Sequence, residues 1–305
     1  MTNAKNLHAT RELTVVLEGY SYLECPRWHE GRLWVSDFYT NQVVATDGKG
    51  GTEVVANVPS QPSGLGFLPD GRALIVSMRD HRVLVRDASG ALSEHADLTG
   101  VVTGMPNDMV VDQRGRAYVG NFGFDLMGGA PLRYTTLTRV DPDGSVTTVA
   151  DDLGFPNGMV ILPGGDVLVV AETFAGRLTA FDIGADGGLS NRRVWAQFGE
   201  VPQTEDVGEA VERLEVGPDG ICLDAEGAIW VADALHNRVL RVREGGEVLE
   251  EIDAGTGVFA CMLGGDDGRT LFMCAAPSFA EHERRPVREA QLLAARVDVP
   301  HAGLP

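Results

Sequence analysis

Four oxygen-bearing side chains stand at a shared place in a repeated pattern of this 305-residue chain. Asn107, Asn157 and Asp219 lie eight residues before a recurring turn glycine, and Glu24 lies seven residues before the first one. Carboxylates and amides that face one another are repulsive and poorly solvated unless a cation lies between them. Because every donor is oxygen, the set suits a hard divalent ion, Ca²⁺ or Mg²⁺, and leaves Mn²⁺ and Zn²⁺ open.

Two copies of the pattern have a different residue at this offset, Ser63 in one and Ala260 in the other. The alternative explanation for the rest is that P-N-G and P-D-G are turn tripeptides, favoured for local backbone reasons. The offset shared by Asn107, Asn157 and Asp219, with Glu24 at the matching place in a first copy that is one residue shorter, favours a common site over separate turns.

The repeated unit is a strand, a turn centred on glycine, and a second strand. It occurs six times, with turn glycines at Gly31, Gly71, Gly115, Gly165, Gly227 and Gly268. Four-stranded propeller blades repeat at about 40 to 45 residues, and most of these spacings fall in or near that range. A third strand-like segment follows each pair, and a fourth follows the first five, as at 52–58 and 145–153. Since long 3.6-residue apolar stripes are missing, the chain is predicted to be all-β.

The sixth copy lacks a fourth strand, and residues 12–19 supply a spare one. We therefore predict a six-bladed β-propeller of four-stranded blades, closed by the N-terminal strand pairing with the last blade. Residues 1–305 are predicted to form one domain, with 1–11 as a flexible N-terminus. An open solenoid is the alternative, but a spare strand at one end that matches a missing strand at the other favours a closed ring.

Composition disfavours several classes of protein. The chain has 44 acidic and 25 basic residues, and its net charge of -19 makes nucleic acid and anionic lipid poor partners. It has no apolar run of membrane-spanning length and no hydrophobic signal core, so we predict a cytoplasmic protein with a small-molecule substrate.

Its four cysteines lack C-x-x-C spacing and are predicted to be buried thiols. The absence of G-x-S-x-G, H-E-x-x-H, P-loop and G-x-G-x-x-G motifs disfavours serine hydrolases and nucleotide enzymes.

Longer segments of the chain resemble the family of senescence marker protein, gluconolactonase and luciferin-regenerating enzyme. The likeness runs from about residue 12 to 299, and is carried by LECPRW, PNDMVVDQRGRAYVGNFG, FPNGMVILPGG and PDGICLDAEGAIWVAD in the family's order. Members of this family are six-bladed propellers that bind one divalent cation on the axis, and many hydrolyse lactones. The resemblance implies that Glu24, Asn157 and Asp219 are metal ligands, with Ca²⁺ the first choice, and that Asn107 contacts the substrate.

The resemblance also implies that Asp219 is the general base or orients water. A carboxylate that binds the ion is a weak base, so we favour action on a water polarised by the cation. One departure concerns Met105, because sugar-lactonase members commonly have an arginine two residues before the substrate asparagine. A thioether cannot replace forked N–H donors, so a less sugar-like substrate is predicted. There are two alternatives: Met105 serves only in packing, or an arginine from another blade enters the site.

Loops on the rim are expected to determine specificity. Residues 121–136 could be an apolar lid or a surface insertion, and Asn121 at their start is predicted to contact substrate. The acidic insert 202–217 could be rim or a short helix. His81 and His236 are candidate acid–base helpers or structural residues.

Asp233 is either a support for the ion or a strand-end turn residue. The resulting prediction is a metal-dependent, lactonase-like hydrolase. An isomerase or lyase that uses the same ion, and a non-enzymatic calcium-binding propeller, are the alternatives. The oligomeric state is left open.

Overall fold

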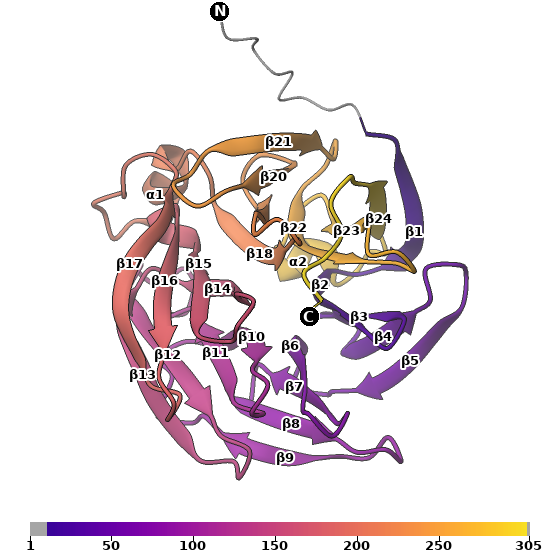
Figure 1. Ribbon diagram of the computed structural model, residues 1–305, viewed down its shortest axis with the longest axis horizontal. Coiled ribbons are helices and arrows are strands. Elements are labelled where there is room, and N and C mark those ends of the chain that lie inside the picture. Colours follow the sequence, from indigo (N-terminus) through magenta and orange to yellow (C-terminus); the bar gives the residue numbers. More distant parts are fainter. Residues whose placement is uncertain (1–10, 304–305) are drawn as a thin grey trace, which may run out of the picture.

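A computed structural model describes residues 11–303. The 24 strands of this part of the chain form six four-stranded antiparallel sheets, arranged as blades around one axis (Figure 1). Each blade runs from the axis outwards in chain order, except that the last is completed from the N-terminus. The predicted all-β, six-bladed propeller is confirmed.

The strands fall into four sets by their distance from the axis. The innermost are Leu23–His29 (β2), Pro62–Phe67 (β6), Pro106–Val111 (β10), Pro156–Ile161 (β14), Pro218–Leu223 (β18) and Val258–Gly264 (β22). The second are Arg32–Asp37 (β3), Ala73–Ser77 (β7), Ala117–Asn121 (β11), Val167–Glu172 (β15), Ile229–Asp233 (β19) and Thr270–Ala275 (β23). The third are Gln42–Thr46 (β4), Arg82–Arg86 (β8), Thr135–Val140 (β12), Arg177–Ile183 (β16), Arg238–Val242 (β20) and Ala290–Arg296 (β24). The outer strands are Leu13–Tyr20 (β1), Thr52–Asn57 (β5), Leu92–Asp97 (β9), Val146–Leu153 (β13), Leu189–Gln197 (β17) and Val248–Asp253 (β21). We number the blades 1 to 6 in the chain order of their innermost strands.

The ring is closed by β1, which pairs antiparallel with β24 from Leu13 opposite Ala295 to Tyr20 opposite Ala290. The outer edge of blade 6 is therefore covered, as the missing fourth strand predicted. The predicted flexible segment 1–11 lies outside the described residues except for Arg11, whose Nε donates to Glu250 at 2.7 Å.

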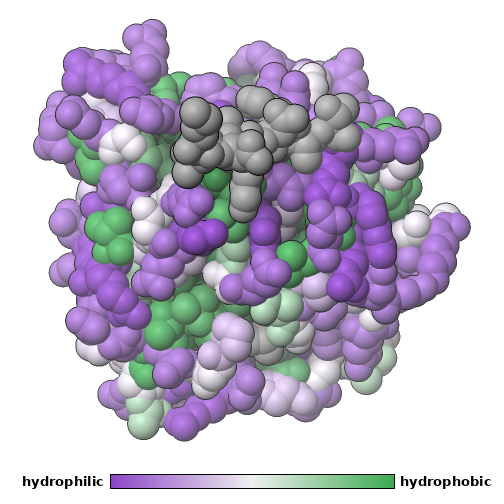
Figure 2. Space-filling model, turned by 45° about the horizontal axis from the view of Figure 1, so that its top comes forward, coloured by the Kyte–Doolittle hydropathy of each residue, from purple (hydrophilic) through white to green (hydrophobic). Residues whose placement is uncertain are grey.

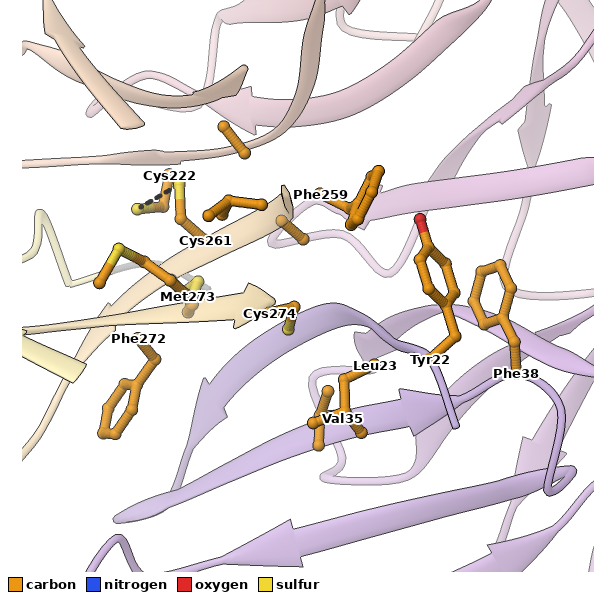
Figure 3. Close-up of a cluster of buried hydrophobic side chains, with 14 of the residues drawn as sticks. Tyr22, Leu23, Val35, Phe38, Cys222, Phe259, Cys261, Phe272, Met273 and Cys274 are labelled. Carbon is orange, nitrogen blue, oxygen red and sulfur yellow. Dashed lines mark hydrogen bonds between the residues drawn. The ribbon is translucent and has the colours of Figure 1, made fainter. Parts of the chain in front are cut away.

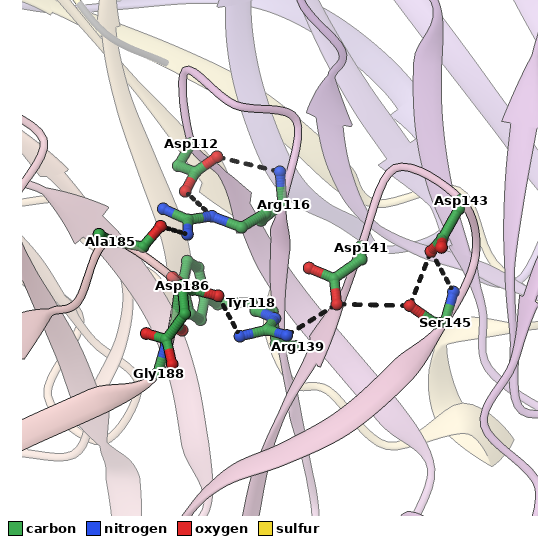
Figure 4. Close-up of polar contacts among 11 residues, drawn as sticks. Asp112, Arg116, Tyr118, Arg139, Asp141, Asp143, Ser145, Ala185, Asp186 and Gly188 are labelled. Atoms are coloured by element: carbon green, nitrogen blue, oxygen red, sulfur yellow. Dashed lines mark hydrogen bonds and ion pairs between the residues drawn. The ribbon is translucent and has the colours of Figure 1, made fainter.

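The turn between the first two strands of each blade requires a left-handed glycine. Gly115, for example, has φ of 80°, which glycine adopts without steric cost. In the same turn, Asp112 accepts the backbone N–H of Arg116 at 3.0 Å and its Nε at 2.6 Å (Figure 4). Arg116 also donates to the carbonyl of Ala185 in blade 4, so the turn joins neighbouring blades.

Neighbouring innermost strands approach closely beside the candidate site residues. A Cβ atom on Gly64 would lie 2.6 Å from the carbonyl oxygen of Asn107, and one on Gly158 would lie 2.5 Å from that of Asp219. Glycine therefore permits the contact between strands at these two points. The inner strands are buried on both faces, and Figure 3 shows part of the resulting core. All four cysteines are buried and free, as predicted.

Helices are few and lie in the rim segments. Val207–Arg213 (α1) forms within the acidic insert, Glu281–Arg284 (α2) lies between β23 and β24, and Thr173–Ala175 (η1) is a single 3-10 turn after β15. Within residues 11–303 no helix has the length and apolar character needed to cross a membrane. The face shown in Figure 2 is mainly hydrophilic, with small separate apolar areas.

Candidate active site

A β-bulge near the start of each innermost strand positions the candidate residues. In β10, Pro106 pairs with Asn121 and Met109 with Val119, so two residues of β10 face one residue of β11. The same shift follows Pro156 in β14 and Pro218 in β18. A bulge changes the direction of nearby side chains, and here the residue after each of these prolines lines a cavity on the axis.

This central cavity brings together Glu24, Asn107, Asn157 and Asp219. It encloses about 110 Å³, and the four side chains are nearly buried, with exposed fractions of 3% to 8%. Blades 1, 3, 4 and 5 each contribute one of them. The structure thus places the four residues at one site, while their chemical roles remain predictions.

Blade 6 contributes an apolar residue at this level. Val258 pairs with Ala275 and Ala260 with Cys274, so Phe259 is the residue in the bulge that lines the cavity. The sequence offset pointed instead to Ala260, because β22 has one residue more than β10 before a turn of the same length. The cavity therefore has an aromatic ring where other blades have an amide or a carboxylate.

A chain of hydrogen bonds fixes the two amides. Ser63 donates to Oδ1 of Asn107 at 2.9 Å, and Nδ2 of Asn107 donates to Oδ1 of Asn157 at 3.1 Å. Asn157 donates in turn to Thr173 at 3.2 Å, which donates to the carbonyl of Pro218 at 2.8 Å. Since a carbonyl oxygen accepts twice, Oδ1 of Asn157 retains a lone pair for a further partner.

The two carboxylates are held in surroundings that disfavour their charge. Burial raises the pKa of Glu24 from its ordinary 4.5 to about 8, against the opposing effect of the backbone N–H of Cys25, which donates to Oε2 at 2.8 Å. Burial, and then the charges of Glu24 and Asp108, raise the pKa of Asp219 well above its usual range. Within the described part of the chain, no lysine, arginine or histidine lines the cavity.

These donors fit a hard divalent cation. Two buried carboxylates and an amide oxygen supply the ligand type that Ca²⁺ and Mg²⁺ prefer, and a cation would stabilise the charges that burial disfavours. Among residues 11–303, no three His, Cys, Asp or Glu side chains gather as a potential metal site. A bound cation here would consequently depend on Asn157 as well as on the two carboxylates.

Three further acidic residues hold the backbone in place just upstream of the candidate ligands. Each is the last residue of the second strand in its blade and is fully buried: Asp37, Glu172 and Asp233. They accept the backbone N–H groups of Tyr22 at 2.9 Å, Gly154 at 2.8 Å and Gly217 at 3.0 Å, respectively. These N–H groups lie two or three residues before Glu24, Asn157 and Asp219.

Asp233 was predicted to be either a support for the ion or a strand-end turn residue, and Asp37 and Glu172 were not predicted to take part in the site. Their shared place at the end of a second strand was the signal that could have found them. Such buried carboxylates fix the backbone that carries the candidate ligands.

Two predicted substrate contacts lie elsewhere. The side chain of Asn121 donates to the carbonyl of Thr136 at 2.8 Å and accepts the N–H of Gly123 at 2.9 Å, so it supports its own loop and does not line the central cavity. Met105 lines a neighbouring pocket of about 360 Å³, which shares Tyr39 and Met127 with the central cavity.

The rim segments contribute to the cavity, while the two histidines do not. Residues 121–136 supply Leu126 and Met127 to its wall, and α1 supplies Val207 and Val211, so the acidic insert is both rim and helix. His81 lines the neighbouring pocket. His236 lies outside both pockets, with its Nδ1 atom 3.0 Å from Asp233.

Comparison with known proteins agrees with this architecture. Residues 23–277 match the SMP-30/gluconolactonase/LRE-like region, and the chain belongs to that family. A pentonolactonase of Haloferax volcanii is 29% identical over 265 residues, which cover 83% of this chain and 81% of the relative. A 6-deoxy-6-sulfogluconolactonase of Pseudomonas putida is 27% identical over 296 residues, covering 92% and 93%. The crystal structure of the calcium-binding protein regucalcin from Agrobacterium tumefaciens superposes with a TM-score of 0.76 at 22% identity, covering 98% of this chain and 97% of the other.

Proposed function

We propose that this protein is a divalent-metal-dependent hydrolase that opens a lactone or a related cyclic ester. One observation carries the proposal: Glu24 and Asp219 are buried in one cavity with the oxygen of Asn157, and no basic side chain from residues 11–303 lines that cavity. The names of the two lactonase relatives, which align over most of the chain, support the reaction class. The regucalcin relatives support Ca²⁺ as the first choice, ahead of Zn²⁺, Mn²⁺ and Mg²⁺.

In this proposal Glu24, Asn157 and Asp219 hold the cation. A divalent cation so bound supplies polarisation of the ester carbonyl and a lower pKa for water. Asp219 accepts a proton from the attacking water, which forms a new C–O bond at the carbonyl carbon. The ring C–O bond then breaks, and the ring oxygen takes the proton from Asp219 to become a hydroxyl, which returns the carboxylate to its starting state.

Asn107 is placed to orient the substrate. One of its two N–H groups donates to Asn157, and the second is left for a substrate oxygen. Because Ser63 fixes Oδ1 of the same amide, the donor direction is set before substrate arrives.

The proposal is tested with purified protein treated with EDTA and then supplied with Ca²⁺, Zn²⁺, Mn²⁺ or Mg²⁺. Hydrolysis of a panel of lactones is followed by acid release. Asp219→Ala should lower kcat by about 100-fold or more and weaken metal binding, while the β-sheet circular dichroism stays unchanged. Asp253→Ala, an exposed position in the same blade, is the matched control. Full activity of Asp219→Ala would refute the proposal.

The regucalcin relatives favour a second candidate, a calcium-binding propeller without turnover. In that case Ca²⁺ would bind and stabilise the protein, yet none of the lactones would be opened. An isomerase or lyase would instead consume a substrate without taking up water, which product analysis by mass spectrometry distinguishes.

A further inference from the structure

The wall of the central cavity above the four polar residues is aromatic. Tyr22 contacts Phe38 and Phe259, with ring centroids 5.3 and 5.1 Å away, and lies between them in Figure 3. On another side, Phe155 contacts Phe122 at 4.7 Å and Phe174 at 6.0 Å. All six of these rings line the cavity, so a bound molecule meets ring faces and edges beyond the polar centre.

The remaining polar atoms of the wall already have partners. The hydroxyl of Tyr39 donates to the carbonyl of Phe279 at 2.6 Å, and that of Thr173 to the carbonyl of Pro218 at 2.8 Å. The hydroxyl of Tyr22 lies 3.4 Å from Glu24. A substrate with several hydroxyls would bury them against rings without hydrogen bonds, which is unfavourable.

The mouth of the cavity is apolar as well. Met127, Val211 and Phe279 are 41%, 37% and 46% exposed and all line the cavity. They come from three separate rim segments: the loop 121–136, α1 and the segment before α2. Among residues 11–303 only six large apolar residues are this exposed, and half of them gather here. A local gathering of exposed apolar side chains marks a binding site for apolar groups.

From these observations we infer that the substrate is a cyclic ester whose ring carries an apolar body, alkyl or aryl, in place of the hydroxyls of a sugar lactone. The inference rests on the proposed function. The ester group lies at the polar centre, and the apolar body contacts the aromatic wall and reaches the mouth between Met127, Val211 and Phe279. The adjoining pocket is more polar, but Met105 gives it an apolar surface and its Arg79 is paired with Glu281 at 2.6 Å.

The first test compares kcat/KM for an alkyl-substituted δ-lactone, the aryl lactone dihydrocoumarin and glucono-δ-lactone, each with saturating Ca²⁺. The alkyl or aryl compound is expected to exceed the hydroxylated one by about 100-fold, since an apolar site provides no partners for hydroxyls. Equal or faster opening of glucono-δ-lactone would overturn the inference and leave the proposed function intact.

A pair of matched variants tests the mouth. Val211→Thr should lower kcat/KM for the alkyl lactone about threefold, because a hydroxyl replaces a methyl group at the apolar contact. The glucono-δ-lactone rate should not fall. Val194→Thr, on the outer strand β17 and 55% exposed, should change neither rate. An equal loss for both lactones in Val211→Thr would contradict an apolar contact at the mouth.

Binding separates failure of this inference from failure of the proposed function. Calorimetry with lactams, which resist hydrolysis, compares an alkyl-substituted ring with a polyhydroxylated ring of the same size. Tighter binding of the alkyl lactam supports the apolar site even if no lactone is opened. Tighter binding of the hydroxylated lactam, or binding of neither, overturns the inference.

Discussion

Asn107 and Asn157, on neighbouring innermost strands, are joined by a hydrogen bond of 3.1 Å from the amide of the first to Oδ1 of the second. The bond connects blades 3 and 4 at the level of the candidate metal site. Asn107 therefore fixes the oxygen that would bind the cation, in addition to its proposed contact with the substrate.

Replacing Asn107 should consequently affect both metal and substrate. Asn107→Ala is expected to weaken Ca²⁺ binding by about 10-fold to 100-fold, because Oδ1 of Asn157 loses the partner that fixes its direction. Titration calorimetry with Ca²⁺ measures the affinity. Asn57→Ala, on the outer strand β5 and exposed, is the control and should leave the affinity unchanged. Unchanged Ca²⁺ affinity in Asn107→Ala would show that Asn107 does not contribute to metal binding and would leave it only the proposed contact with the substrate.

The raised pKa of Glu24 predicts how stability varies with pH in metal-free protein. Its folded pKa of about 8 exceeds the ordinary value of 4.5, so the folded protein keeps a proton that the unfolded chain releases. The stabilising contribution is complete below about pH 4.5 and is lost as the pH rises through about 8. Thermal unfolding in EDTA should therefore show a lower Tm at pH 8 than at pH 5, and Glu24→Gln should reduce the difference.

Adding Ca²⁺ should oppose this loss at pH 8, because the cation favours the ionised carboxylate. At a free Ca²⁺ concentration of 100 times the Kd, binding is expected to raise the free energy of unfolding by about 2.7 kcal/mol. The same Tm difference in the parent chain and Glu24→Gln would show that another group causes it.

A buried ion pair near the site should be important for stability. Arg27 donates to Asp108 at 2.7 Å, and both side chains are about 95% buried, with exposed fractions of 5% and 3%. Arg27→Met would leave Asp108 without its partner and is expected to cost about 3–5 kcal/mol, as measured by urea unfolding. Arg72→Met, which removes an exposed pair with Asp70, should leave the urea midpoint unchanged. Similar midpoints for both variants would contradict this assignment.

Replacing Met105 is expected to change the specificity for the substrate. Met105→Arg should raise kcat/KM for glucono-δ-lactone about tenfold, because a guanidinium adds hydrogen-bond donors for hydroxyls in the adjoining pocket. Met105→Leu, which keeps the apolar character, should leave that rate unchanged. A gain in both variants would indicate an effect of packing, and no gain in Met105→Arg would show that this pocket does not receive the substrate.

Much of the fold could be predicted because its signals are local and repeated. Turn glycines such as Gly115 and Gly227 need a left-handed backbone, and strand segments alternate beside them, so both are visible in a short window of sequence. The unpaired segment 12–19 predicted the closure between β1 and β24. The equivalent places of Glu24, Asn157 and Asp219 in the repeat predicted that they would lie at one level.

Which side chains reach the cavity and which support it could not be predicted from the repeat. The extra residue of strand β22 brings Phe259 to the cavity in place of Ala260, and the side chain of Asn121 is used within its own loop. Asp37 and Glu172 support the site only because the fold brings the backbone N–H groups of Tyr22 and Gly154 within hydrogen-bond distance of their carboxylates.

By itself, the sequence determined the number of blades, the closure of the ring and the residues that begin the innermost strands, since these depend on periodic local preferences. The tertiary structure alone determined which side chains form the wall, because the segment 121–136, α1 and the segment around Phe279 are not part of the repeated hairpin pattern and come together only in the folded ring. Contacts between such segments depend on packing over long sequence distances, for which local patterns carry no signal.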